Sequence, residues 1–163
     1  MKTIFTIANS AFVFFNIFLF LPDWAYSQIQ LSTGETVYVS AYANVYSGPK
    51  TLEFRLATML SIRNTDPKYG ITILKVDYYD NTGKMVDRYI KEPSELGPLA
   101  SMHVYIKDSD KRRRSGPGTN FIVKWRSANK VNQPIIEAIM LGLASGHGLS
   151  FTCPGQIIKD HKD

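Results

Sequence analysis

The chain is poor in cysteine and histidine, and this removes several classes of protein at once. Its single cysteine, Cys153, excludes an internal disulfide framework and a cysteine-rich zinc site. The 11 glycines follow no period and the charge is mixed in sign, so the composition matches neither collagen nor a disordered segment. The chain has no Gly-x-Ser-x-Gly elbow and no His-x-x-x-His spacing. The sequence therefore predicts a non-enzymatic protein with no metal and no cofactor.

The beginning of the chain differs from the rest. An apolar stretch, residues 4–21, holds six of the nine phenylalanines and is ended by Pro22. Ala25 and Ser27 are the small residues that signal peptidase reads at −3 and −1, which predicts a signal peptide over residues 1–27. An uncleaved anchor is the alternative, because the stretch approaches the ~20 residues that span a bilayer. Either way we expect an exported protein, periplasmic or secreted, or anchored in the membrane through its apolar stretch.

The remaining residues, 28–163, alternate apolar and polar side chains with a period of two, which predicts strands with one buried face. The longest run, 52–62, places Leu52, Phe54, Leu60 and Ile62 on one face. Seven or eight strands are expected, among them 37–46, 52–62, 71–79, 84–90, 102–107, 121–126, 134–144 and 148–153. Turns every 8–12 residues favour a single antiparallel β-sandwich, with a small barrel as the alternative. Its core is expected over about 34–158.

Three connecting segments need separate interpretation. Asp80-Asn81-Thr82-Gly83 is typical of a short hairpin in which glycine supplies the positive φ. Residues 93–98 contain two prolines and are expected to form a loop. Residues 134–144 suit a helix by length, but Gly142 and the glycines that follow favour a strand paired with 148–153.

Few residues are candidates for catalysis or metal binding. The three histidines, His103, His147 and His161, are expected on an outward strand face, in a glycine-flanked turn and in the tail, all facing solvent. Two further pairs are candidates: Glu53 with Glu137 as glycosidase carboxylates, and Asp77 with Asp80 as calcium ligands, although the hairpin turn already explains Asp80. Cys153 is expected to be a buried small apolar residue, and most of the tyrosines are expected to pack on the sheets.

The strongest local charge feature is Lys111, Arg112, Arg113 and Arg114, within a predicted loop over 108–119. Four adjacent cations at a loop tip attract anions, so lipid headgroups, acidic polysaccharide or an acidic protein face are the candidate partners. Nucleic acid is not expected, because no aromatic residues are interleaved with the charge. A solvated hairpin tip with no partner is the alternative.

Several motifs occur in an order that resembles a known family. They are Ser61-Ile62-Arg63-Asn64-Thr65-Asp66-Pro67, Val76-Asp77-Tyr78-Tyr79-Asp80, Thr82-Gly83-Lys84, Leu96-Gly97-Pro98-Leu99, Asn120-Phe121-Ile122-Val123-Lys124-Trp125, Pro134-Ile135-Ile136-Glu137-Ala138 and Leu149-Ser150-Phe151-Thr152. Over residues 34–158 the chain resembles the bacterial family catalogued as domain of unknown function 3124. The resemblance implies a small exported domain with no assigned activity, so it supplies no site residues. The strand rhythm also loosely resembles immunoglobulin-like accessory sandwiches.

These observations predict an exported, non-enzymatic β-sandwich that binds or supports a component of the bacterial cell envelope. The loops 108–119 and 145–148 are the expected contact regions, because loops at the ends of a rigid sandwich carry recognition. Two alternatives stay open. One is a structural subunit that assembles through its edge strands, and the other is a small hydrolase whose site the sequence does not reveal.

Overall fold

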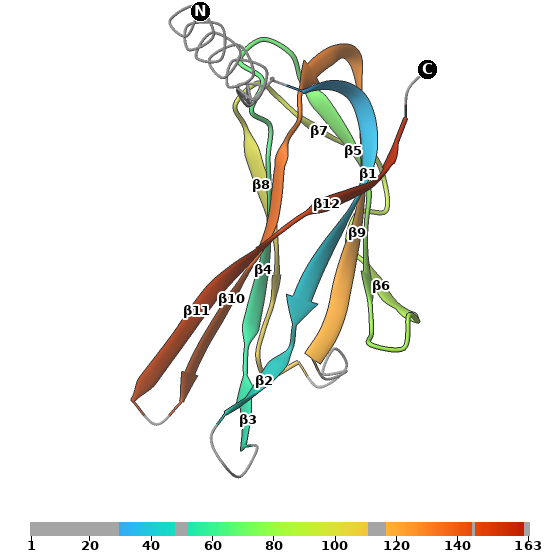
Figure 1. Ribbon diagram of the computed structural model, residues 1–163. Helices are drawn as coiled ribbons and strands as arrows, with labels where there is room; N and C mark the ends of the chain where they lie inside the picture. Colours follow the sequence, from blue (N-terminus) through green and yellow to red (C-terminus); the bar gives the residue numbers. More distant parts are fainter. Residues whose placement is uncertain (1–29, 48–51, 111–116, 145, 162–163) are drawn as a thin grey trace, which may run out of the picture.

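The computed structural model describes residues 30–47, 52–110, 117–144 and 146–161, and every regular element in these ranges is a β-strand (Figure 1). Within them, no helix is long and apolar enough to cross a membrane. The predicted signal peptide, 1–27, lies outside the described residues. The strands are β1 (Leu31–Tyr42), β2 (Asn44–Ser47), β3 (Leu52–Arg55), β4 (Ala57–Arg63), β5 (Ile71–Tyr79), β6 (Met85–Arg88), β7 (Ser94–Leu96), β8 (Ser101–Ile106), β9 (Pro117–Asn132), β10 (Ile135–Ala144), β11 (His147–Pro154) and β12 (Gln156–Asp160).

The strands form antiparallel sheets. One has the order β12-β1-β9-β5-β6, with β7 also paired to β5, and a second has the order β11-β10-β4-β8. The hairpin of β2 and β3 forms a small third sheet. The all-β antiparallel class is therefore confirmed. The expected seven or eight strands were too few, because several predicted strands are divided and short edge strands were missed.

Buried side chains of the two larger sheets belong to one continuous core. Val39, Phe121 and Trp125 contribute to it from the six-stranded sheet, and Leu60 and Met140 from the four-stranded sheet, all fully buried. On β9 the alternation is as predicted, since residues 121, 123 and 125 are buried while 122, 124 and 126 are partly or fully exposed. The period-two pattern thus identifies the core face of this strand correctly.

The predicted single strand over 52–62 is wrong in one respect. The chain breaks at Leu56, whose backbone N–H donates to the carbonyl oxygen of Ala43 at 3.0 Å. Before the break β3 pairs with β2, and after it β4 pairs with β10 and β8. Leu52, expected on the buried face, is 65% exposed because the β2–β3 hairpin extends away from the core (Figure 1).

Other boundaries also differ from the expected ones. Residues 93–98 are not only a loop, because β7 pairs with the beginning of β5 as a three-residue edge strand. The predicted loop over 108–119 ends earlier, since β9 begins at Pro117. The segment 134–144 is a strand, as favoured, and it pairs with β11 in the predicted hairpin. Gly83 has a φ of 81°, which confirms its role in the hairpin before β6.

A buried asparagine fastens the turn after β4. The Asn64 side-chain nitrogen donates to the backbone oxygens of Tyr69 and Gly97, at 2.8 and 2.9 Å. Its side-chain oxygen accepts the backbone N–H of Asp66 at 3.0 Å. Asn64 is therefore more than a turn former, since it joins its own turn to the segment after β7.

The neighbouring carboxylate extends this network. Asp66 accepts backbone N–H groups from Tyr69 at 2.9 Å, from Lys68 at 2.8 Å and from Asn132 at 3.1 Å. These hydrogen bonds, with that from Tyr69 the largest cause, lower the pKa of Asp66 below its usual value. The Asp66 carboxylate, which accepts these backbone hydrogen bonds, thus also connects the turn to the end of β9.

The chain passes from one large sheet to the other at Gly155. Its N–H donates to the Ile136 oxygen at 2.8 Å, and β12 then pairs with β1. A Cβ at this position would lie 2.6 Å from Val37 Cγ1, so only glycine fits the crossing without displacement. Figure 1 shows β12 running obliquely from the end of β11 to the far side of the molecule.

Candidate functional site

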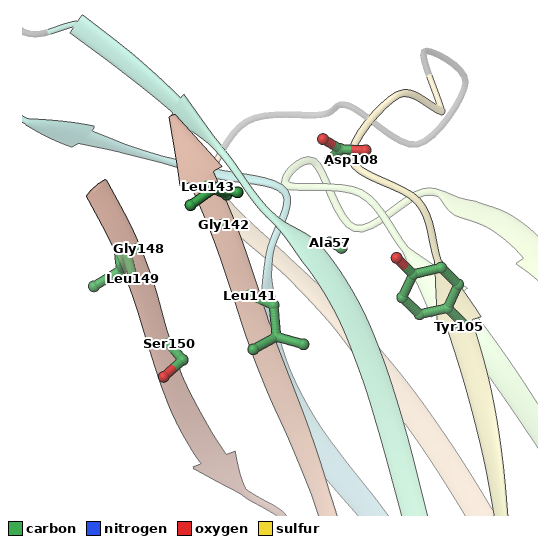
Figure 2. A pocket seen from close by; sticks show the side chains of 9 residues that line it. All are labelled: Ala57, Tyr105, Asp108, Leu141, Gly142, Leu143, Gly148, Leu149 and Ser150. Carbon is green, nitrogen blue, oxygen red and sulfur yellow. The ribbon is translucent and has the colours of Figure 1, made fainter. Parts of the chain in front are cut away.

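A groove lies on the outer face of the four-stranded sheet (Figure 2). Its volume is about 630 Å³, within the range of ligand pockets. The lining residues come from β11, β10, β4, β8 and the segment after β8, and are Ala57, Tyr105, Asp108, Leu141, Gly142, Leu143, Gly148, Leu149 and Ser150. The groove therefore crosses the whole width of the sheet.

Strand alternation explains why this face is apolar. In β10, Ala138 and Met140 are buried in the core, so the odd-numbered Leu141 and Leu143 point to the opposite face and are 46% and 82% exposed. Leu141 pairs with Ala57 on β4, whose small side chain forms the floor between larger neighbours. Figure 2 shows Leu141 and Tyr105 on opposite sides of Ala57.

Gly142 keeps this part of β10 close to the chain that precedes β4. A Cβ on Gly142 would lie 2.7 Å from Leu56 Cδ2 and would clash with the ring of Phe54. The sequence reasoning treated Gly142 as evidence against a helix, which is correct but incomplete. The glycine is also required because the side chains of Phe54 and Leu56 occupy the space where its own would be.

Polar groups lie at both edges of the groove. The Tyr105 hydroxyl and the Asp108 carboxylate come from the end of β8 and the residues after it, while Ser150 lies on β11 (Figure 2). Tyr105 is 51% exposed, which fits a tyrosine that offers an apolar ring and a polar end to a partner. The groove thus combines an apolar floor with a few polar groups, as binding sites commonly do.

The two loops expected to carry recognition flank the groove from its two sides, beside β8 and at β11. Asp108 begins the first of them and Gly148 ends the second, and both line the groove. Lys111, Arg112, Arg113 and Arg114 lie outside the described residues, so their contribution stays a prediction. The described flanks of both loops line the same groove, but from opposite edges of the sheet.

The outward leucines were missed by the sequence reasoning. Both faces of β10 are apolar, so the strand shows no alternation that separates the core face from the outer face. The polar residues of the neighbouring strand could have identified the outer face. On β4, Ser61 and Arg63 occupy the outward positions, and they pair with the odd-numbered residues of β10. Residues 139, 141 and 143 must then share that face.

The histidines are separated in the structure. His103 is exposed on β8, as expected, and His147 is the exposed first residue of β11. His161 differs from the expectation of a solvent-facing tail residue. It is half-buried, its Nε2 lies 2.9 Å from Thr36 Oγ1, and its N–H donates to the Gly34 oxygen, because β12 draws the chain end onto β1.

The candidate carboxylates have other partners. Arg88 donates to both oxygens of Asp77, at 2.7 and 3.1 Å, and Lys75 lies 3.2 Å away. Burial raises the pKa of Asp77, but the hydrogen bonds from Arg88 and Lys75 outweigh it and leave the pKa below its usual value. Asp80 accepts N–H groups of Thr82 and Lys84 at 2.9 Å, as the predicted turn requires.

Neither glutamate of the candidate pair lines the groove. Glu53 lies 3.9 Å from Arg55 in the exposed β3, while Glu137 is on β10 opposite Ser61. Cys153 is partly buried against the core, close to expectation, and burial raises the pKa of its thiol. Among the described residues, no three histidine, cysteine or acidic side chains are grouped to hold a metal ion.

Comparison with known proteins identifies the family but no activity. No curated protein matches the chain. A solved structure, the crystal structure of Thermotoga maritima 1070, is similar over 77% of this chain and 96% of that one, with 12% identity and a TM-score of 0.47. The model of the family described as protein of unknown function (DUF3124) matches residues 34–158. The chain therefore belongs to the DUF3124 family.

Proposed function

We propose that this protein is an exported, non-enzymatic β-sandwich that binds an anionic amphiphile of the cell envelope through the groove on its four-stranded sheet. The observation that carries the proposal is the outward apolar face formed by Leu141, Leu143 and Tyr105. Apolar side chains that line a hollow, rather than being scattered over a surface, mark a binding surface.

Charge selects the class of partner. The groove wall at Asp108 is only three residues before Lys111, the first of four consecutive cations. A run of cations that follows the groove wall this closely in the sequence would suit a ligand with an apolar part and a negative headgroup. An anionic lipid combines both parts in one molecule, whereas an acidic polysaccharide leaves the leucines uncovered.

The shared core supports the sandwich architecture in this proposal. Side chains from both large sheets join in one cluster, while the groove residues lie on the opposite face of β10 from Met140. A rigid two-layer scaffold holds such a groove in a fixed shape. The signal-like segment 1–27 supports export to the compartment where the partner occurs.

Vesicle flotation tests the proposal with the exported form, residues 28–163, because the apolar segment 4–21 would itself bind any vesicle. We expect retention on phosphatidylglycerol vesicles but not on phosphatidylcholine vesicles, and we expect Leu141→Ser with Leu143→Ser to abolish the retention. Ile135→Ser is the matched control, because Ile135 is a similarly exposed residue at the other end of the same strand. Equal retention of the groove variant and the control would contradict a role for the groove.

The cationic run is tested separately by replacing Lys111, Arg112, Arg113 and Arg114 with serine. We expect retention to weaken and to lose most of its salt dependence, because fewer charges then face the anionic surface. If the protein binds an acidic polysaccharide but does not bind the vesicles, the partner is a polysaccharide and not a lipid. Retention unaffected by salt and by the substitution would remove electrostatics from the proposal.

Edge strands favour one further candidate function. β11 and β8 end the four-stranded sheet, and in the described part of the chain each pairs on one side only. Such edges present backbone groups that a second chain can pair with. Light scattering after size-exclusion chromatography distinguishes a monomeric binding module from a subunit that assembles in this way.

A further inference from the structure

A second cavity lies on the six-stranded sheet, where the described chain ends. Its volume is about 360 Å³, and it shares no lining residue with the groove. The lining residues are Thr33, Leu74, Lys124, Trp125, Arg126, Ser127 and His161. The cavity thus lies between β1, β9, β5 and the residue that follows β12.

Two cations of the same strand face this cavity. Lys124 and Arg126 alternate with the fully buried Trp125, so both side chains lie on the outer face of the sheet. No ion pair joins either of them to a carboxylate among the described residues. Within the described ranges, their charge is therefore not compensated by a carboxylate in an ion pair.

The register adds positive charge around Lys124. Lys75 stands directly opposite it on β5, and Thr36 on β1 stands between Lys124 and Lys159 of β12. Directly opposed like charges destabilise a sheet, and side chains at such positions are about 5 Å apart at Cβ. A row of three lysines across four strands is therefore an arrangement that a bound anion would stabilise.

The acidic groups nearby do not cancel this charge. Asp77, two residues from Lys75, is already held by Arg88 at 2.7 Å as well as by Lys75. Asp160 stands opposite Glu35, whose side chain is buried on the core side of β1. Lys124 and Arg126 are left as the free cations at the cavity.

The walls of the cavity are held in place by hydrogen bonds. The Thr33 hydroxyl donates to the His161 oxygen at 3.2 Å, and the Ser127 hydroxyl donates to the Gly70 oxygen at 2.9 Å. Both hydroxyls are thereby committed to the backbone. The Lys124 ammonium and the Arg126 guanidinium remain as donors for a ligand, and this pair suits phosphate and sulfate oxygens.

We propose that this cavity binds a compact oxyanion, a phosphate or sulfate group, between the side chains of Lys124 and Arg126. The proposal does not depend on the function proposed for the groove, since the two hollows lie on different sheets. At about 360 Å³ the cavity is smaller than the groove, and the backbone of β1 and β9 bounds it, so it suits a tetrahedral group with a substituent better than a polymer.

Inorganic phosphate is the probe, titrated into the isotope-labelled full chain while amide chemical shifts are recorded. We expect saturable shifts at residues 124–127, and at least tenfold weaker binding for Lys124→Gln and for Arg126→Gln, since each variant loses a charged donor. Lys130→Gln is the matched control, because Lys130 lies on the same strand, is exposed and does not line the cavity.

Several results would overturn the proposal. They are shifts that do not saturate, shifts confined to other parts of the chain, or equal weakening by Lys130→Gln. The amide spectrum shows whether each variant is folded, and Arg126→Lys, which keeps the charge, should bind more tightly than Arg126→Gln. Equal phosphate affinity of Arg126→Lys and Arg126→Gln would show that the positive charge at this position does not bind the ion.

A second titration separates the two sources of such a group. Phosphatidylglycerol vesicles are presented to the exported form of the groove variant Leu141→Ser with Leu143→Ser, so that retention through the groove is removed. Retention that Arg126→Gln abolishes identifies a lipid headgroup as the ligand. Phosphate binding without retention on vesicles identifies a free phosphorylated molecule, and either result supports the oxyanion site.

Discussion

Replacing Asn64 with alanine should destabilise the protein strongly, although it removes only a few atoms. The substitution leaves the Tyr69 and Gly97 oxygens without their donor and the Asp66 N–H without its acceptor. A buried polar group left without a partner costs about 1–3 kcal/mol, but these groups lie near the surface and water reaches some of them. We therefore expect a loss of about 3 kcal/mol in the free energy of unfolding.

Urea unfolding followed by circular dichroism measures this loss. For a domain of this size a loss of that magnitude corresponds to a fall in Tm of roughly 10 °C. Asn129→Ala is the control, because Asn129 is exposed on β9 and surface substitutions of this kind stay within about 0.5 kcal/mol. The two measurements together separate the buried network from a general effect of asparagine replacement.

Asn64→Asp sharpens the test. Aspartate keeps the acceptor for the Asp66 N–H, but when ionised it cannot donate to the Tyr69 and Gly97 oxygens and places a negative charge against them. We expect a loss at neutral pH at least as large as that of Asn64→Ala. A loss below about 1 kcal/mol for both variants would refute the reasoning that these hydrogen bonds hold the turn.

Three further predictions concern a glycine and two charges. Gly142→Ala places a Cβ within 2.8 Å of a backbone oxygen and should lower stability by about 1–3 kcal/mol in thermal unfolding, whereas Gly148→Ala, with open space around it, should change it little. Burial raises the pKa of Glu35, so the wild type should lose stability relative to Glu35→Gln as pH rises above about 4.5, and parallel stability curves for the two proteins would contradict this. Asp77→Asn should cost about 2 kcal/mol at neutral pH through the lost pairing with Arg88. That difference should disappear in acid, as pH falls below 3.8 and through the lowered pKa of Asp77.

The sequence predicted strands best where one face is polar. On β9 the alternation around Trp125 identified both the strand and its core face. It failed on β10, because the outward Leu141 and Leu143 are as apolar as the core residues Ala138 and Met140 of the same strand. The alternation along a strand shows only which side chains are apolar. When both faces are apolar, the neighbouring strands must be known before the buried face can be identified.

Changes of pairing partner were also invisible in the sequence. The alternation from 52 to 62 is unbroken, yet the chain leaves one sheet and enters another at Leu56. The cation pair Lys124 and Arg126 was read as the polar side of a strand, and nothing local indicated that His161 would lie beside it. Such sites depend on contacts between distant segments, which a one-dimensional pattern does not encode.

The pairing of β12 with β1 has a consequence for how the molecule is made. The first described strand has β9 and β12 as its two neighbours, and both come late in the chain. As the ribosome extends the chain, a local hairpin such as β10–β11 can form soon after its two strands have been synthesised. β1, in contrast, has no strand to pair with on either edge until β9 has been synthesised. Topologies dominated by distant pairings fold slowly, typically within about milliseconds to seconds. Among the described strands, β1 therefore gains its second neighbour only after β12 has been synthesised.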